Sequence, residues 1–583
     1  MDVTEHEAAP SDAAPEASSS SGTLRKEVWQ GEEFTLVEEG KAKILYPAGH
    51  QVFYNPVQEY NRDMSVMMLR LFAEEWTVKE GKPLRILEAL AATGLRSVRY
   101  AKEIEGLDFV IANDLDEKAV EAIHRNREYN GVDPSKLRTT KSDAAFLLHK
   151  LKNDMATQAP DRLDFLSVVD LDPYGGASPF LDGAVSTVCE GGLLAVTCTD
   201  LAVLCGNYAE SCWAKYGAMP PKRTEYCHEM ALRIVLGSIS SHAARHHRHI
   251  EPVVSMFADF YVRVFVRVYK HGGELKKVPS RNGYIMQCTT CDSREVQKIG
   301  KFVEPTPGNV KFSQGYAPVV NEKCGDCGGS WKMGGPMWMD PIHSEVWLSR
   351  AMAHLEDPSA PEKYGTHKRM LGTITNMLDE MKLPHVPFFY TISQLSNTLH
   401  LQTPKLDAFR SALVSLGYKV ASTHCAPGAV KTDAPYSVIL DVMRAWHAIA
   451  PAKLSKVSEN SPAFKILSIP PSRTNISFDI VEEAKAITHT KTGVKLGRYP
   501  IHPPNWGPGS KAGRKRDSSS MVEELIERRK ENQGKYTTKK KVAKLAEGQV
   551  PSSSSSSEEG ENSGVAKASS SSSSGPSSSS MQN

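Results

Sequence analysis

Short apolar segments alternate with helical patterns between residues 83 and 200, and this alternation restricts the fold more than any other feature of the chain. The predicted strands are residues 84–89, 109–113, 163–170 and 193–199, and the predicted helices among them are residues 95–105 and 118–129. This order predicts a parallel, doubly wound sheet, because parallel strands can be joined only by a crossover connection. Alternating apolar residues over 253–269 indicate two antiparallel strands that complete the sheet at one edge.

Composition divides the chain of 583 residues into four parts. Residues 1–33 are acidic and Ser-rich, and residues 507–583 are first basic and then Ser-rich, so both segments are predicted to be disordered. Residues 34–273 include the strand–helix alternation and form the first predicted domain. Residues 274–506 are richer in Gly, Pro, Cys and Trp and show further helical patterns, which predicts a second, α+β domain.

Overall charge and hydropathy exclude few function classes. Lys and Arg exceed Asp and Glu by 70 − 68 = 2, but local basic clusters still allow contact with nucleic acid. No segment approaches the ~18 consecutive apolar residues of a membrane span, so we expect no membrane association. The acidic start resembles neither a secretory signal nor a transit peptide.

Two short basic runs, at residues 511–516 and 539–541, lie in the segment before the Ser-rich end. They indicate a nuclear-import signal or an arm that contacts phosphates, with a plain solvated tail as the alternative. We therefore expect a nuclear location, and cytoplasmic or mitochondrial pools stay open. Nothing in the sequence indicates the oligomeric state.

Acidic residues follow several of the predicted strands, at the edge where doubly wound sheets bind ligands. The turn after the first strand, residues 88–97, contains one glycine and lacks G-x-G-x-x-G, so it provides no obvious cradle for a dinucleotide pyrophosphate. Asp114 follows the strand at residues 109–113 and is placed to accept hydrogen bonds from ribose hydroxyls. Asp143 follows a further strand end, before the strand at residues 163–170, and is within reach of an adenine amino group. A single Asp at a strand end is more often a helix cap. Together, in this order, the acids predict an S-adenosylmethionine site.

The strand at residues 163–170 leads into Asp170-Leu-Asp172-Pro-Tyr174-Gly. An exocyclic base amine is a poor nucleophile because its lone pair is delocalised into the ring, and a carboxylate that accepts its proton makes it reactive. We therefore predict Asp172 as the proton acceptor, Tyr174 as a stacking platform for the base, and Asp170 as a supporting carboxylate. A buried turn with a capping Asp is the alternative. Amino-methyltransferases of DNA, RNA and proteins share variants of this motif.

The chain also resembles one family in particular, the tRNA guanine-26 N2-dimethyltransferases of eukaryotes and archaea. The matching motifs are FYNPVQEYNRD at residues 53–63, ATGLRSVR at 92–99, ND at 113–114, SDA at 142–144, DPYG at 172–175 and TDL at 199–201. The resemblance spans about residues 34–506. It implies a Rossmann-like class I methyltransferase sheet and a tRNA substrate.

Site roles follow from the same resemblance. It implies that Arg62 and Arg96 contact S-adenosylmethionine, and that Asp114, Asp143 and Ala144 line its nucleoside end. Asp172 would be catalytic, with Phe53 beside the target guanine opposite Tyr174; the family often has Phe at the position of Tyr174. The list of expected site residues is thus Asp172, Tyr174, Phe53, Arg62, Arg96, Asp114, Asp143 and Ala144.

The implied reaction adds two methyl groups in succession to the 2-amino group of guanosine 26. One alternative is an amino-methyltransferase of another RNA or of DNA. Another is a non-catalytic RNA-binding or chaperone module on a retained methyltransferase fold. The intact acidic and aromatic residues of the predicted site argue against the second alternative.

Two C-x2-C pairs predict a structural zinc site in the second domain. Its expected ligands are Cys288, Cys291, Cys324 and Cys327. Four thiolates satisfy tetrahedral Zn²⁺ and leave no open position for catalysis; disulfides, an iron–sulfur centre or an empty site are the alternatives. The other six cysteines, at positions 189, 198, 205, 212, 227 and 425, have no ligand spacing and are predicted to be small buried side chains. We expect the second domain to grip the tRNA backbone.

Overall fold

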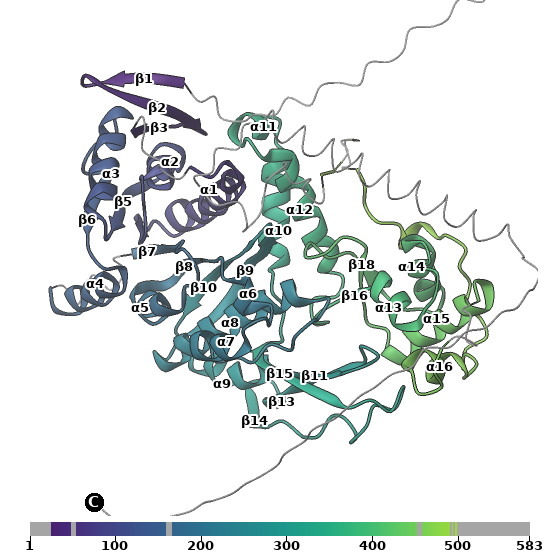
Figure 1. Ribbon diagram of the computed structural model, residues 1–583. Helices are drawn as coiled ribbons and strands as arrows, with labels where there is room; N and C mark the ends of the chain where they lie inside the picture. Colours follow the sequence, from purple (N-terminus) through teal and green to yellow (C-terminus); the bar gives the residue numbers. More distant parts are fainter. Residues whose placement is uncertain are drawn as a thin grey trace, which may run out of the picture. The chain divides into compact units, whose positions relative to one another are not determined.

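The computed structural model describes residues 25–47, 54–158, 166–451, 457–489, 493 and 496–497 (Figure 1). Phe53 and the predicted disordered tail, residues 507–583, lie outside these ranges. Among the described residues, no helix combines the length and the apolar character that a membrane crossing requires.

A seven-stranded sheet forms the centre of the first half of the chain, with the strand order β6-β5-β4-β7-β8-β10-β9. Its strands are β4 (Leu84–Glu88), β5 (Leu107–Asp114), β6 (Leu137–Lys141), β7 (Leu166–Leu171), β8 (Val188–Cys198), β9 (His249–Ala258) and β10 (Tyr261–Tyr269). The first five strands in this order are parallel, whereas β10 pairs antiparallel with β8 and β9. The predicted doubly wound sheet with an antiparallel edge is therefore confirmed, although β8 begins earlier than the predicted strand.

Helices cover both faces of this sheet, because successive side chains of a buried strand point to opposite sides. Ile86, Val110 and Val168 pack with α1 (Glu59–Ala73), α2 (Leu95–Glu103) and Ile123 of α3 (Glu117–Tyr129). Their strand neighbours Leu87, Ile111 and Val169 pack on the other face with α4 (Ala144–Gln158), α5 (Leu181–Thr187) and α8 (Cys227–Arg245). Strands buried on both faces explain why the sequence shows continuous apolar runs.

A small antiparallel sheet precedes the central one and corrects a predicted boundary. Its strands are β1 (Arg25–Trp29), β2 (Glu32–Glu39) and β3 (Ala42–Pro47). The prediction that residues 1–33 are disordered is thus wrong for the part from Arg25 onward, since β1 pairs along its length with β2. The backbone N–H of Leu45 in β3 donates to Asn126 of α3 at 2.9 Å, which attaches this sheet to a helix that covers the central sheet.

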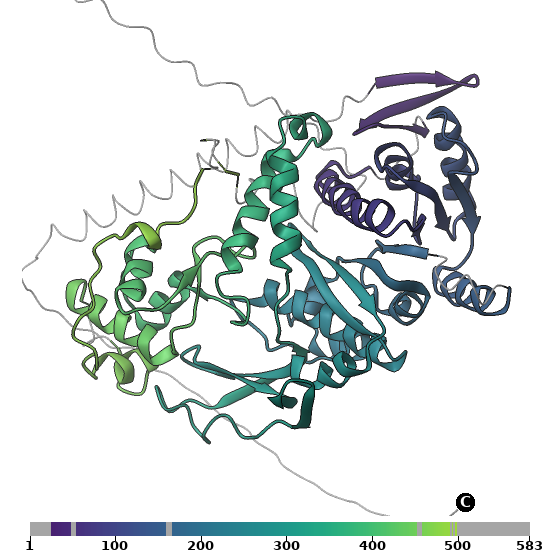
Figure 2. The same ribbon diagram turned by 180° about the vertical axis from the view of Figure 1, so that it is seen from behind.

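The second half of the chain contains small sheets and helices. The strands are β11 (Asn282–Cys288), β12 (Arg294–Lys298), β13 (Gly300–Thr306), β14 (Asn309–Gln314), β15 (Trp331–Trp338), β16 (Tyr390–Thr391), β17 (Val420–Ala421) and β18 (Ala429–Thr432). The helices are α9 (Gly272–Arg281), α10 (Glu345–Glu356), α11 (Ala360–Lys363), α12 (His367–Glu380), α13 (Ile392–Leu399), α14 (Leu406–Ser415), α15 (Tyr436–Ile449) and α16 (Pro462–Leu467). Helices α10 and α12 lie side by side, as both ribbon views show (Figures 1 and 2).

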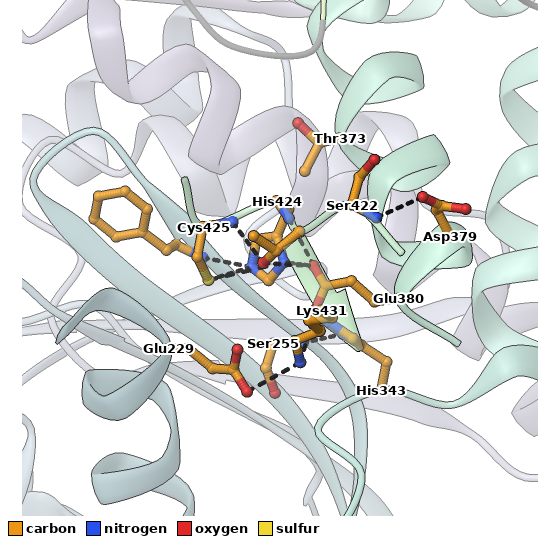
Figure 3. A network of polar contacts seen from close by, with 12 residues as sticks. Glu229, Ser255, His343, Thr373, Asp379, Glu380, Ser422, His424, Cys425 and Lys431 are labelled. Carbon is orange, nitrogen blue, oxygen red and sulfur yellow. Dashed lines mark hydrogen bonds and ion pairs between the residues drawn. The ribbon is translucent and has the colours of Figure 1, made fainter. Parts of the chain in front are cut away.

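A buried polar network joins the two halves of the chain (Figure 3). Glu380 at the end of α12 accepts a hydrogen bond from His424 Nδ1 at 2.6 Å and lies 3.5 Å from the Lys431 ammonium. Lys431 also pairs with Glu229 of α8 at 3.0 Å. Burial alone would raise the pKa of Glu380, but His424 and Lys431 outweigh burial and lower it. The network therefore pairs charged groups of opposite sign inside the protein.

Candidate active site

The loops after β4, β5 and β6 are joined by one buried side chain at the carboxyl edge of the sheet. The Asn113 amide donates to the carbonyl of Ala89 at 3.0 Å and to the carbonyl of Ser142 at 2.9 Å. Its oxygen accepts a hydrogen bond from Thr140 at 2.8 Å. Because Asn113 is fully buried, these bonds hold the three loops in fixed positions.

Asp114 lies next to Asn113 and shapes the turn after β4. Its Oδ2 accepts the backbone N–H of Ala92 at 2.8 Å, and Ala92 has the positive φ of 49° that few non-glycine residues adopt. Gly94 also has a positive φ, 76°, and an added Cβ there would lie 3.2 Å from Ile123. The turn is thus tight and brings the backbone close to any ligand bound above β4.

Asp143 and Ala144 follow β6, as predicted. Asp143 Oδ1 accepts the backbone N–H of Phe146 at 2.9 Å and therefore caps α4. Ala144 is the first residue of α4 and is buried. The capping role that a single Asp most often plays is present at Asp143, beside the position expected for an adenine.

Asp172 forms an ion pair with the guanidinium of Arg96, which reaches it from α2. Arg96 also donates to Ser65 at 2.8 Å and lies 3.5 Å from Glu88. The Asp172 side chain keeps 24% exposure, whereas that of Arg96 keeps 5%. Tyr174, two residues further, is 84% exposed.

Backbone and side-chain contacts from the end of β8 hold the loop that contains Tyr174. The Gly175 N–H donates to Thr199 Oγ1 at 2.8 Å, and the Thr199 N–H donates to the Gly175 carbonyl at 2.8 Å. An added Cβ at Gly176 would lie 2.4 Å from the hydroxyl of Tyr216 and 2.7 Å from Asp200, so this position requires glycine. Tyr216 itself donates to Asp200 at 2.9 Å.

Asp170 lies beneath the loop and is completely buried. Both of its oxygens accept from Arg263 of β10, at 2.9 and 3.0 Å, and Tyr100 donates to it at 2.6 Å. Burial alone would raise the pKa of Asp170, but Arg263 and Arg96 outweigh burial and lower it. Asp170 therefore supports Arg96, as a carboxylate that is not exposed to substrate.

Glu88 at the end of β4 is a second buried acid. Its carboxyl group accepts a hydrogen bond from Ser97. Burial raises the pKa of Glu88 to about 8, with smaller contributions in the same direction from Asp170 and Asp172. The site thus holds three acids around one arginine. Glu88 and Asp170 are both buried, and the ion pair with Arg263 is what lowers the pKa of Asp170 while that of Glu88 is raised.

Arg62 lies in α1 and pairs with a carboxylate of β2. Its guanidinium donates twice to Glu39, with Nε 2.6 Å from Oε1. Burial alone would raise the pKa of Glu39, but Arg62 and Arg99 outweigh burial and lower it to about 2. Both arginines expected to contact a cofactor, Arg62 and Arg96, are therefore held by carboxylates in this structure.

The four cysteines of the C-x2-C pairs converge, as predicted. All four Sγ atoms lie within 4.8 Å of one another. Cys288 and Cys327 are 3.5 Å apart and Cys291 and Cys324 are 3.6 Å apart, far longer than the ~2.05 Å of a disulfide. Tetrahedral zinc with Zn–S bonds of about 2.3 Å requires S···S distances of about 3.8 Å. The four thiols could therefore hold one tetrahedral metal ion.

A glycine leaves the room that this cluster needs. An added Cβ at Gly329 would lie 2.8 Å from the Cys288 sulfur and 2.4 Å from the hydroxyl of Thr290. That hydroxyl is 3.0 Å from the Cys327 sulfur. The donor set and the close packing around it match a structural tetrathiolate site.

Several residues of the site escaped prediction from the sequence. Arg263 is separated from Asp170 by 93 positions, and an arginine in β10, between β8 and β9, gives no sequence signal of burial. Glu39 is one of several acids in its segment, so the sequence does not distinguish it as the partner of Arg62. Glu88 was noted as the start of the turn but not as a titrating group.

Comparison with known proteins gives consistent results. The sequence model described as "TRM: N2,N2-dimethylguanosine tRNA methyltransferase" matches residues 31–444. The chain is 40% identical to a mouse tRNA (guanine(26)-N(2))-dimethyltransferase, and the match covers 86% of this chain and 80% of the mouse protein. A Saccharomyces cerevisiae relative named as the mitochondrial tRNA (guanine(26)-N(2))-dimethyltransferase is 35% identical, covering 82% of this chain and 92% of that protein.

A solved structure is similar as well. It is described as Trm1 from Pyrococcus horikoshii in complex with S-adenosyl-L-methionine. The TM-score is 0.56 and the sequence identity is 29%, over 70% of this chain and 98% of the archaeal chain.

Proposed function

The chain belongs to the N2,N2-dimethylguanosine tRNA methyltransferase family, and we infer that it transfers two methyl groups from S-adenosylmethionine to the 2-amino group of guanosine 26 in tRNA. The observation that best supports this function is the Asp172–Arg96 ion pair beside the exposed ring of Tyr174, at the carboxyl end of β7. It combines a proton acceptor and a stacking surface at the edge where such sheets bind ligands.

The residues around the tight turn after β4 suit S-adenosylmethionine. Asp114 borders the turn and has the chemistry to accept hydrogen bonds from a ribose, and Ala144 provides a small buried wall after β6. Arg62 has the donors for a carboxylate group and already binds that of Glu39. When bound, S-adenosylmethionine supplies an electrophilic methyl group.

We assign the proton transfer to Asp172. A guanine stacked on Tyr174 would present its 2-amino group toward this carboxylate, which accepts the N–H proton as the nitrogen becomes a better nucleophile. Arg96 keeps the carboxylate oriented, because it is itself fixed by Ser65 and lies close to Glu88 and Asp170. The monomethylated amine retains one N–H, so the same carboxylate serves the second transfer. We also propose that Phe53 lies on the other side of the guanine, opposite Tyr174; this residue is outside the described ranges.

Two exposed aromatic side chains extend this surface along α7 (Ala209–Tyr216). Tyr208 is 54% exposed and Trp213 is 56% exposed. Tyr216 of this helix donates to Asp200 and lies close to Gly176 of the catalytic loop (residues 172–176, after β7). Aromatic rings beside the site of a splayed base are common stacking partners for flanking nucleotides. We therefore propose that α7 contacts the tRNA next to the target guanosine.

We propose zinc for the four-cysteine cluster, with a structural role. The cluster lies between β11 and β15 and would fix the connection that contains the β13–β14 hairpin. We propose that the protein is located in the nucleus, with a second pool in mitochondria. The name of the yeast relative includes a mitochondrial location. The division into domains of residues 34–273 and 274–506, the second gripping tRNA, also stays a proposal.

The test compares two tRNA transcripts that differ in one base. One carries guanosine at position 26 and the other carries inosine, which lacks the 2-amino group. Methyl transfer from labelled S-adenosylmethionine should occur to the first and not to the second. Equal transfer to both would show that another atom or another position is the target.

A further inference from the structure

A second group of metal-ligating side chains lies where the end of α6 (Leu201–Leu204) meets the start of α8. Ligand atoms of Cys205, Cys227 and His228 all lie within 4.8 Å of one another, and all three residues are half-buried. From the sequence, both cysteines are expected to be small buried side chains without ligand spacing. The structure differs because the chain leaves after Cys205 and returns at Cys227, so residues 22 positions apart meet.

The orientation of His228 is the arrangement that metal-binding histidines use. Its Nδ1 lies 3.3 Å from the carbonyl oxygen of Cys425. A carbonyl only accepts, so Nδ1 carries the hydrogen and Nε2 carries the lone pair. The ring also stacks on Phe257, with centroids 3.8 Å apart and an interplanar angle of 8°. A ligating histidine typically donates its other ring N–H to a backbone carbonyl in this way.

The cluster closes the base of the segment that contains α7. Cys205 is the residue that ends α6, and Cys227 is the first residue of α8. Between them, an added Cβ at Gly206, whose φ is +92°, would lie 2.9 Å from the carbonyl oxygen of Pro221, so the two ends of the segment run close together. The Cys205 thiol lies 3.5 Å from the Cys227 carbonyl, a weak contact that leaves the sulfur lone pairs available to a metal ion.

The other histidine cluster of the described residues does not have this chemistry. In the network of Figure 3, His424 Nε2 accepts the backbone N–H of Phe257 at 3.2 Å, so its Nδ1 carries a hydrogen toward Glu380. The Lys431 ammonium already lies 3.5 Å from the same carboxylate. Both ring nitrogens of His424 are thus hydrogen-bonded, and the Lys431 ammonium already neutralises Glu380, so these residues do not offer a ligand set for a metal ion.

We propose that Cys205, Cys227 and His228 bind a second zinc ion, with water as the fourth ligand. Two thiolates and a neutral imidazole suit Zn²⁺ and neutralise its charge, and binding releases the two thiol protons. Small side-chain rotations bring sulfurs from within 4.8 Å to the ~3.8 Å of a tetrahedral site. The ion clamps both ends of the α7 segment and so stiffens the helix that packs on the catalytic loop. This zinc site does not depend on which tRNA position is methylated.

The test is the zinc content of the full chain, prepared without a histidine tag. The protein is reduced, loaded with Zn²⁺, dialysed and analysed by mass spectrometry for metal per chain. We expect two zinc ions in the unchanged protein, one in Cys227→Ser and one in the double variant Cys324→Ser/Cys327→Ser. Cys189→Ser is the matched control, because Cys189 is a buried cysteine of β8 outside the cluster, and it should keep two.

Two results would overturn the proposal. One is a single zinc ion in the unchanged protein that disappears in the Cys324→Ser/Cys327→Ser variant. The other is a Cys227→Ser protein that keeps both ions. Because Cys227→Ser could fail to fold, His228→Ala provides a second route: it should lose one zinc ion while circular dichroism stays unchanged, and retention of both ions would contradict the site.

Discussion

Replacing Asp172 with asparagine separates the two properties that we assign to this side chain. The asparagine oxygen can still accept a hydrogen bond from Arg96, but the amide cannot take a proton from the guanine amine. General-base catalysis contributes about 10²–10⁴-fold to a rate. We therefore expect the rate of methyl transfer to fall by about 10²-fold or more, which corresponds to roughly 3 kcal/mol at the transition state.

Stability should change much less in this variant. Arg96 retains the hydrogen bond to Ser65 at 2.8 Å and the buried carboxylate of Asp170 at 3.8 Å. Asp172 itself is partly exposed, so solvent screening reduces the value of the ion pair to about 1 kcal/mol or less. The affinity for S-adenosylmethionine should stay within a factor of about three, a change of less than 1 kcal/mol.

The assay is single-turnover methyl transfer at saturating tRNA, with cofactor affinity from calorimetry and stability from thermal unfolding. Asp108→Asn is the matched control, because Asp108 pairs with Arg85 near the opposite end of β5 and should leave the rate unchanged. A rate loss below tenfold would refute the assignment of Asp172 as the proton acceptor. A loss of cofactor affinity as large as the loss of rate would instead make Asp172 a binding residue.

Four other substitutions test contacts outside Asp172. Arg263→Met leaves Asp170 buried without its main partner and should lower the free energy of unfolding by about 3–5 kcal/mol in urea titrations. The control Lys43→Met removes an exposed pair with Glu38 and should lower it by under about 1 kcal/mol. Equal losses of stability in the two variants would contradict the buried pair. The pKa of Glu39 falls from 4.5 to about 2, so its carboxylate stabilises the fold above pH 4.5, by about 3 kcal/mol, and this contribution is lost as the pH falls toward 2. The free energy of unfolding of Glu39→Gln should therefore be lower at pH 7 and should fall less between pH 5 and 2 than that of the unchanged protein. If the two proteins lose the same stability over this pH range, the pair with Arg62 is absent in solution. Gly329→Ala should weaken zinc binding about tenfold or more in chelator competition, because its Cβ would lie 2.8 Å from the Cys288 sulfur. Gly325→Ala places its Cβ in open space and should bind zinc as the unchanged protein does. Unchanged zinc affinity in both variants would argue against the close packing of Gly329 on this cluster. Trp213→Ala should raise the KM for tRNA about fivefold or more with kcat and cofactor affinity retained. Trp213→Phe keeps an aromatic ring and should have a KM close to that of the unchanged protein. An unchanged KM in Trp213→Ala would remove α7 from the proposed RNA surface.

The sequence predicted those parts of the site that depend on strand order. Asp114 ends one parallel strand and Asp143 and Asp172 follow two others, and the carboxyl ends of parallel strands meet at one edge of the sheet. Their convergence could therefore be predicted once the alternation of strands and helices was recognised. The C-x2-C pairs behaved in the same way, because a short spacing places two thiols together whatever the fold.

The unpredicted parts depend on contacts between distant segments. Arg263 reaches Asp170 from an antiparallel strand that enters the sheet much later in the chain, and Glu39 reaches Arg62 from the small N-terminal sheet. Cys205 and Cys227 meet only because residues 206–226 leave and return to the same place. Neither hydropathy nor local spacing records such meetings, since each depends on how the whole chain packs.

The N-terminal boundary was placed too late for a related reason. Its acidic, polar composition is typical of disordered segments, and β1 is largely exposed. The strand forms because its backbone pairs with β2 and because Trp29 packs edge-on against Tyr129 of α3, with ring centroids 5.1 Å apart. Pairing and one aromatic contact thus outweigh an unfavourable composition.

The most direct test of the proposed reaction is nucleoside mass analysis of an unmodified tRNA transcript after incubation with this protein and S-adenosylmethionine. We predict N2,N2-dimethylguanosine, at position 26 alone. Monomethylguanosine as the final product would contradict the second transfer to the same amine. Transcript that stays unmethylated while the protein binds S-adenosylmethionine would contradict the assignment of tRNA guanosine as the substrate.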